Sequence, residues 1–255
     1  MSGFVDAHAH LGAHGDFLMP RGGADDLVRR MDALGVERTA LSANAAFCSD
    51  FRLGNDQAAA AAAAHPGRIF FYAVANPHYP DGMAPELERC AGLPGFVGVK
   101  LHSTTHNVAL DSSLYDPAWS WARERGCPVL VHFWAAHGLC GSGNVRKAAA
   151  RWPGVKLVLA HLGGFGEAWR ELLPLAAEHP RLWFDTCGSR HARGAIEGLV
   201  AGGRAGRLLY GSDAPWIDPG SQIGKVLYAD IPEGARAAIL GGNARRLFGW
   251  EEAKD

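Results

Sequence analysis

Apolar runs of strand length recur along the chain, and most of them end in polar residues. In the first run, residues 4–10, apolar positions alternate with Asp6, His8 and His10, which is the two-residue period of a β-strand. This period predicts that the three polar side chains share one face. Polar groups on a face that should be core are costly unless they are satisfied, and metal ions commonly satisfy pairs of histidines.

Helical segments separate these runs. Residues 24–34 form an expected helix that ends before Gly35, an alanine-rich helix precedes Pro66, and residues 116–125 end before Gly126. The eight expected strands span residues 4–10, 38–44, 69–77, 96–102, 128–134, 156–161, 182–187 and 208–215. Near the end of the chain, Asn243 is expected to cap the last helix.

Eight strand–helix units predict a somewhat distorted (β/α)8 TIM barrel with its active site at the C-terminal ends of the strands. Parallel strands need helical crossovers, and eight strands close at a size that side chains can fill. The alternative is an open doubly wound sheet, but no G-x-G-x-x-G follows the first strand. No linker or low-complexity tail interrupts the pattern, so we expect one domain over residues 1–255.

Composition narrows the classes of partner. The chain of 255 residues is 48% hydrophobic and 20% charged, with a formal net charge of -1, which gives no electrostatic argument for binding nucleic acid or an anionic membrane. No apolar run reaches membrane-spanning length and no signal peptide pattern opens the chain, so we expect a cytoplasmic protein that acts on a small molecule. The five cysteines are scattered without a C-x-x-C pair, as expected for reduced, buried thiols.

A barrel brings the ends of its strands to one mouth, so the polar residues there form the candidate site. Imidazole and carboxylate groups converging from distant positions suit a divalent metal such as zinc. Asp185 is expected to have a structural role. The polar residues at the strand ends are His8, His10, Lys100, His102, His132, His161, Asp185 and Asp213.

The order of these residues resembles the amidohydrolase superfamily. Its pattern is H-x-H on the first strand, lysine on the fourth, histidine on the fifth and sixth, and aspartate on the eighth. The segments GVKLH, LAHLGG, YGSDAP and NARRLFG are similar to the amidohydrolase-2 branch, which contains small metal-dependent hydrolases. The resemblance extends from Val5 to Phe248.

The resemblance implies a metal centre. His8, His10, His132 and Asp213 would be metal ligands, and His161 would be either a ligand of a second metal or a catalytic base. Zinc is the expected ion, with manganese as the alternative, and the pattern leaves open whether one ion or two are bound. A homodimer would fit the family.

Lys100 has two readings under this resemblance. It stands where some relatives carry a carboxylated lysine that bridges two metals, and an uncarboxylated Lys100 would instead bind a substrate carboxylate or phosphate. His102 lies two residues further on and faces the same way, so it competes for the substrate-binding role.

The first functional hypothesis is a hydrolase that opens an amide, lactone or ester-like bond with a metal-activated water. Asp213 would take the proton of that water, and His161 would orient or polarise the substrate. The runner-up is a non-oxidative decarboxylase of an aromatic or unsaturated acid, and Lys100 favours hydrolysis. A barrel that only binds a ligand is a third reading, which the filled ligand positions oppose.

Loop residues after the strands supply the candidate substrate pocket. Trp134 and Trp216 follow expected ligands by two or three residues and are expected to wall the pocket. The segment CGSRHARG contains Arg190 and His191 and is the candidate anion-binding patch.

Overall fold

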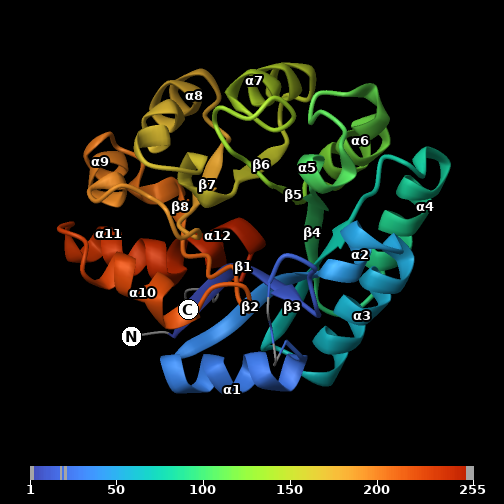
Figure 1. Ribbon diagram of the computed structural model, residues 1–255, viewed down its shortest axis with the longest axis horizontal. Helices are drawn as coiled ribbons and strands as arrows, with labels where there is room; N and C mark the ends of the chain where they lie inside the picture. Colours follow the sequence, from blue (N-terminus) through green and yellow to red (C-terminus); the bar gives the residue numbers. More distant parts are fainter. Residues whose placement is uncertain (1–2, 18, 20–21, 251–255) are drawn as a thin grey trace, which may run out of the picture.

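Eight parallel strands form one sheet in their order along the chain, and helices surround it (Figure 1). The computed structural model describes residues 3–17, 19 and 22–250. The sheet is a nearly closed barrel, so the predicted TIM-barrel fold is confirmed. In the described part of the chain, no helix is long and apolar enough to cross a lipid bilayer.

All eight predicted strands are present, although the last six are shorter than predicted. The strands are β1 (Phe4–Leu11), β2 (Val36–Ala43), β3 (Ile69–Val74), β4 (Phe96–Leu101), β5 (Pro128–Val131), β6 (Lys156–Leu159), β7 (Trp183–Asp185) and β8 (Leu208–Leu209). The α-helices are α1 (Ala24–Leu34), α2 (Asn44–Cys48), α3 (Phe51–Ala64), α4 (Pro80–Ala91), α5 (Ser103–His106), α6 (Asp116–Arg125), α7 (Ser142–Arg151), α8 (Leu172–Glu178), α9 (Ala195–Ala201), α10 (Pro219–Leu227), α11 (Glu233–Ala237) and α12 (Asn243–Phe248).

Helices α1 and α6 end where the sequence predicted. Gly35 follows α1 with φ 71°, and Gly126 follows α6 with φ 63°. Both glycines adopt the left-handed conformation that closes a helix C-terminus, which residues with a Cβ atom adopt at a cost.

The barrel closes at a seam, where β1 pairs with the segment of chain that follows β8. Residues 210–214 run beside β1 after the short β8. The Ala7 N–H donates to the Tyr210 carbonyl at 2.9 Å, and the Asp213 N–H donates to the His8 carbonyl at 2.9 Å. This seam carries Asp213 to the side of β1 that holds the histidines.

The first strand contains a β-bulge. Asp6 lies opposite Thr39 of β2 and Ala9 lies opposite Leu41, so two residues of β1 face one residue of β2. A bulge interrupts the alternation of side chains, because the extra residue shifts everything beyond it to the other face.

The bulge removes Asp6 from the face of the two histidines, so the prediction that all three share one face was wrong. Val5 and Ala7 pack inside the barrel, which turns Asp6 the other way. Beyond the bulge, Ala9 packs in the layer between sheet and helices, which leaves the two histidines of the strand facing inward.

Asp6 stabilises the seam. Its Oδ1 accepts the backbone N–H groups of His8 at 3.1 Å and Ser212 at 2.9 Å, and its Oδ2 accepts the Ser212 hydroxyl at 2.5 Å. Burial raises the pKa of Asp6 to about 6, although the hydrogen bonds from Ser212 and His8 oppose the shift. One carboxyl group therefore ties β1 to the chain beyond β8.

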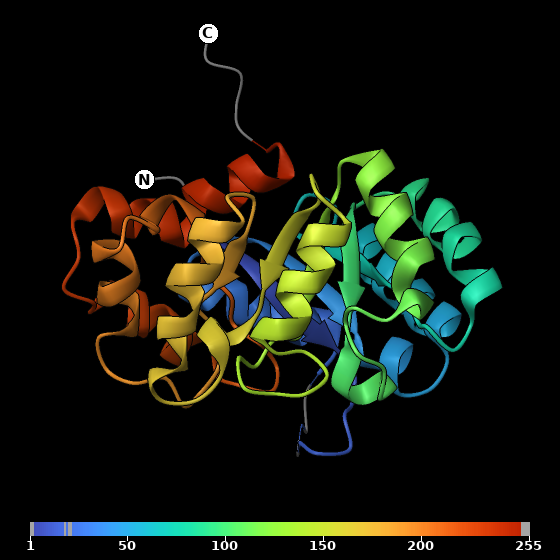
Figure 2. The ribbon, with the colours of Figure 1, turned by 90° about the horizontal axis from the view of Figure 1, so that it is seen from above.

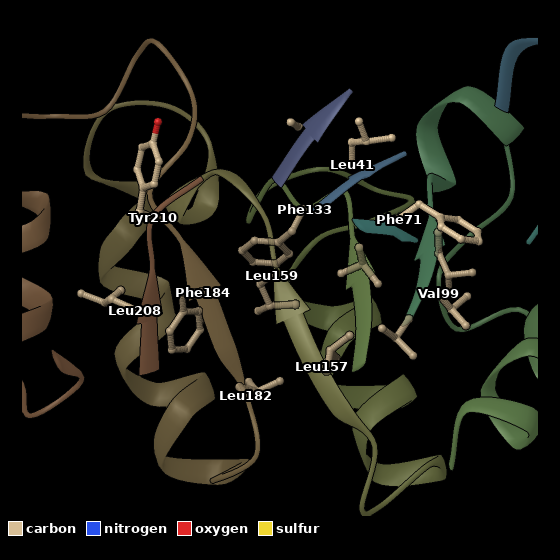
Figure 3. Close-up of a cluster of buried hydrophobic side chains, with 14 of the residues drawn as sticks. Leu41, Phe71, Val99, Phe133, Leu157, Leu159, Leu182, Phe184, Leu208 and Tyr210 are labelled. Carbon is tan, nitrogen blue, oxygen red and sulfur yellow. The ribbon is translucent and has the colours of Figure 1, made fainter. Parts of the chain in front are cut away.

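Two apolar layers support the barrel. The outer layer fills the space between the strands and the helices. Figure 3 labels ten of its residues, namely Leu41, Phe71, Val99, Phe133, Leu157, Leu159, Leu182, Phe184, Leu208 and Tyr210. The inner layer includes Tyr72 and Leu130 and is continuous with Ala244 and Leu247 of α12. Helix α12 lies at the end of the barrel away from the strand arrowheads, so it closes that end (Figure 2).

Asn243 does not cap the last helix, so that prediction was wrong. A π-helical turn, Ala238–Gly242, runs directly into α12, so no free helix N-terminus remains there to be capped. The buried amide of Asn243 instead donates to the carbonyls of Ala205 at 2.8 Å and Leu208 at 2.6 Å. It therefore anchors the start of β8.

Replacing Asp6 tests the seam. We expect Asp6→Ala to lower the free energy of unfolding by about 2–4 kcal/mol, because three donors lose their acceptor in a buried position. Asp6→Asn keeps an acceptor oxygen and should cost about 1 kcal/mol. Urea unfolding at pH 7 measures both, and equal stability of Asp6→Ala and the parent protein would contradict this role.

Candidate active site

The polar residues that end the strands converge at the C-terminal mouth of the barrel. Asp213 has φ 59° and His161 has φ 66°, in the left-handed region that side chains with a Cβ atom rarely adopt. Such backbone strain is concentrated at functional sites, where the surrounding structure holds it in place.

The carboxylate of Asp213 is at the centre of the cluster. Its Oδ1 lies 3.1 Å from His10 Nε2 and 3.7 Å from His8 Nε2, and its Oδ2 lies 3.7 Å from His161 Nδ1. Burial alone would raise the pKa of Asp213, but His161, His10 and His8 outweigh it and hold this pKa well below its usual range. Three imidazoles from two strand ends therefore face one ionised carboxylate.

His132 contacts this cluster through His161. Its Nδ1 lies 3.2 Å from His161 Nε2, and its ring stacks on His102 with centroids 4.3 Å apart. Burial lowers the pKa of both His10 and His132 to about 3. Both rings are therefore neutral, and a neutral imidazole is the form that binds a metal.

Lys100 is buried beside the first histidine. Its Nζ lies 2.9 Å from His8 Nε2. Burial lowers the pKa of Lys100 to about 8, against the opposing charges of Asp213 and Asp185.

Asp185, which we expected to be structural, contacts the site directly. Its Oδ2 lies 2.8 Å from His8 Nδ1, and its Oδ1 accepts the backbone N–H groups of His161 at 2.9 Å and Cys187 at 3.2 Å. A carboxylate next to Nδ1 holds the proton on that nitrogen and leaves Nε2 with its lone pair. The placement of Asp185 at the end of the seventh strand was the sequence signal for this role.

Cys187 also lies in the cluster, although it was not among the site residues expected from the sequence. Its Sγ lies 3.2 Å from both His8 Nδ1 and His161 Nδ1, and 2.9 Å from Asp185 Oδ1. Burial raises the pKa of the Cys187 thiol well above its usual range. Its position two residues after Asp185 is a signal that could have found it, because residues so spaced share a strand face.

Among the residues that the structure describes, two groups of three buried side chains could hold a metal ion. One is His8, Cys187 and Asp213, and the other is His161, Asp185 and Cys187. Within each group, the donor atoms lie within 4.8 Å of one another.

Aromatic side chains surround the cluster. Trp216 stacks on His10 with centroids 3.8 Å apart and on Phe17 at 5.0 Å. Trp134 lies 5.1 Å from the ring of His132 and 4.9 Å from that of Phe165. Phe17 and Phe165 are 41% and 51% exposed, and neither was among the pocket residues expected from the sequence.

The remaining predicted pocket residues have other contacts. Arg190 is exposed and its guanidinium lies over Phe165, whereas His191 Nε2 donates to the Cys187 carbonyl at 2.6 Å. His102 Nδ1 accepts a hydrogen bond from the Thr105 hydroxyl at 3.0 Å, at the start of α5. A role of these residues in binding substrate stays a prediction.

The amidohydrolase family profile (Amidohydro_2) matches residues 5–250. The chain belongs to the amidohydrolase-2 family. A curated relative, gamma-resorcylate decarboxylase from Polaromonas sp., is 24% identical over 88% of this chain and 86% of its own length.

Solved structures share the amidohydrolase fold. A 2,6-dihydroxybenzoate decarboxylase in complex with 2,6-dihydroxybenzoate superposes with a TM-score of 0.78 at 21% identity, over 98% of this chain and 99% of that one. The dihydroxybenzoic acid decarboxylase of Polaromonas sp., with bound manganese and the inhibitor 2-nitroresorcinol, gives a TM-score of 0.75 at 22% identity, over 99% of this chain and 98% of that one.

The expectation that this protein is a hydrolase was wrong. Its curated relatives are gamma-resorcylate decarboxylases and the decarboxylase OrsB, which favours the runner-up hypothesis. The error has a physical reason, because imidazole and carboxylate ligands hold a cation equally well for either reaction. Lys100, which favoured hydrolysis, therefore does not discriminate between the two.

The tautomer of His8 tests the contact with Asp185. We expect ¹H–¹⁵N NMR to show His8 with its proton on Nδ1, because that nitrogen faces the Asp185 carboxylate. Asp185→Ala should remove this preference, whereas Asp111→Ala, outside the site, should not. A His8 ring protonated at Nε2 in the parent protein would contradict the assignment.

Proposed function

We propose that this protein is a metal-dependent, non-oxidative decarboxylase of an aromatic carboxylic acid. The observation that carries the proposal is the cluster of imidazoles around the Asp213 carboxylate, in a chain whose curated relatives are decarboxylases. The solved relative from Polaromonas sp. contains manganese, and a divalent cation fits the donor set of this chain.

The donor set supports a cation on chemical grounds. His10 Nε2 and His8 Nε2 both face Asp213 Oδ1, at 3.1 and 3.7 Å. These buried groups combine neutral nitrogen donors with a negative oxygen, and a cation balances that charge. We propose His8, His10, His132 and Asp213 as the residues that hold it.

The bound cation would act as a Lewis acid that polarises the oxygens of the substrate carboxylate. In the reaction, the bond between the ring carbon and the carboxylate breaks, CO₂ leaves, and a proton takes its place on the ring carbon. The pair formed by Asp213 and His161, with Oδ2 and Nδ1 3.7 Å apart, is positioned to hold and deliver that proton.

The aromatic side chains around the cluster support an aromatic substrate. Trp216 stacks on His10 and Trp134 lies against His132, and Phe17 and Phe165 contact these two tryptophans. Aromatic faces favour offset stacking with another ring and exclude water from the reacting carbon. These side chains would orient the ring of the substrate.

Product analysis tests the reaction. We expect the metal-loaded protein to release CO₂ from at least one hydroxylated benzoic acid, with 2,6-dihydroxybenzoate and 5-carboxyvanillate in the panel. In D₂O, the product should carry deuterium at the carbon that bore the carboxylate. No CO₂ release from any acid of the panel would contradict the proposal.

Substitution separates metal binding from proton transfer. We expect His8→Ala and His10→Ala to weaken metal binding at least about 100-fold, because each removes a nitrogen donor. Asp213→Asn should lower kcat about 10²–10⁴-fold while it keeps part of the metal. Metal analysis and steady-state kinetics measure these effects, with His65→Ala as the control outside the site. Normal activity of any of the three variants would remove that residue from the site.

A further inference from the structure

The chain leaves the sheet soon after β7, at a turn that we call the β7 turn, residues 186–188. Strand β7 ends at Asp185, and the Thr186 N–H still donates to the Leu209 carbonyl at 2.9 Å. Gly188 then has φ 109°, and a Cβ atom added there would lie 2.8 Å from His191 Nε2, so the turn is tight. The carbonyls of the β7 turn lie beyond the strand and need donors from elsewhere, because buried backbone groups have to be paired.

Two side chains from other parts of the chain supply these donors. Lys225 Nζ lies 3.5 Å from the Thr186 carbonyl oxygen and also donates to the Gly188 carbonyl. Between them, the Cys187 carbonyl accepts a hydrogen bond from His191 Nε2 at 2.6 Å. Three consecutive carbonyls are therefore held by an amine and an imidazole.

Lys225 is itself fixed on a well-anchored helix. Helix α10 buries Ile223, and the Tyr210 hydroxyl donates to the Pro219 carbonyl at its first turn, at 3.3 Å. On the same helix, Gln222 Oε1 accepts a hydrogen bond from Lys225 Nζ at 2.6 Å. A lysine side chain loses much conformational freedom when it is held in this way, so its contacts have to offset that cost.

The β7 turn is connected to the site through Asp185, the residue directly before it. Asp185 Oδ2 lies 2.8 Å from His8 Nδ1, and its Oδ1 accepts the N–H groups of His161 at 2.9 Å and Cys187 at 3.2 Å. A shift of the turn would move the backbone of Asp185 and lengthen these contacts. Hydrogen-bond partners of a metal-binding histidine matter because they fix the orientation and tautomer of its ring.

We propose that Lys225 is a positioning residue of the active site, which holds the β7 turn so that the Asp185 carboxylate stays on His8 Nδ1 and on the His161 N–H. Lys225 acts through Asp185, from the side of the turn that faces α10. With the proton kept on His8 Nδ1, the lone pair of Nε2 remains directed at Asp213 Oδ1, 3.7 Å away. The inference deepens the proposed function, and only its kinetic test rests on that function.

Proton exchange measured by ¹H–¹⁵N NMR tests the positioning role without measuring activity. In Lys225→Met, we expect the His8 Nδ1 proton and the Cys187 N–H to exchange with water at least about tenfold faster than in the parent protein, because the turn opens locally. The amide of Ala122 in α6 should exchange at the parent rate, since only a general loss of stability would speed exchange there. Lys147→Met, which alters a lysine whose side chain is 73% exposed, should leave all three rates unchanged.

Steady-state kinetics give the second readout, with an acid that the parent protein decarboxylates. Lys225→Met should lower kcat about tenfold and leave KM within about twofold, because the aromatic side chains proposed to bind the substrate ring lie outside the β7 turn. Lys225→Arg should recover most of the lost kcat, because a guanidinium also donates hydrogen bonds to carbonyl oxygens.

The outcomes separate this role from the proposed function. Unchanged exchange at His8 and Cys187 in Lys225→Met, or equally faster exchange at Ala122, would overturn the positioning role. If Lys225→Met does not fold, Gln222→Met decides in the same way, because it removes the acceptor that fixes the amine. Faster exchange confined to the site, in a protein that decarboxylates no acid of the panel, would keep the positioning role and overturn the proposed function.

Discussion

The structure depends on the seam where the chain after β8 meets β1. The backbone bonds across it join residues that also belong to the site, since the His8 carbonyl accepts the N–H of Asp213. The hydrogen bonds that close the barrel therefore also bring Asp213 next to the first-strand histidines. Asp6 reinforces the seam from outside the site, with both carboxylate oxygens directed at backbone and hydroxyl donors. A loss of pairing here would separate the first-strand histidines from Asp213.

The seam also places several ionisable side chains next to one another at the mouth of the barrel. Two carboxylates, Asp185 and Asp213, lie among buried imidazoles and the amine of Lys100. Each group carries a large desolvation cost, which the others offset only in part. A cluster of this kind does not stabilise a fold by itself. The presence of this cluster in the core is explained if its side chains together bind a cation, whose charge balances theirs.

The chemistry shows why a ligand set does not identify a reaction. Imidazoles and a carboxylate around one position suit either the activation of water or the polarisation of a substrate carboxylate. Under the proposed function, the choice between the two reactions rests on the relatives, which are decarboxylases, and on the aromatic rings of Trp134 and Trp216 beside His132 and His10.

The sequence by itself determined the number and order of the strands, the helix stops at Gly35 and Gly126, and the strand ends that carry His8, His10, Lys100, His161 and Asp213. These features are local, because they follow from the periods of strand and helix and from glycine at left-handed positions. Only the tertiary structure decided the bulge that turns Asp6 away, the anchoring role of Asn243, and the contacts of Asp185 and Cys187 with His8. These contacts join residues far apart in the chain, and the curvature and register of the closed barrel, which no local period encodes, set their distances.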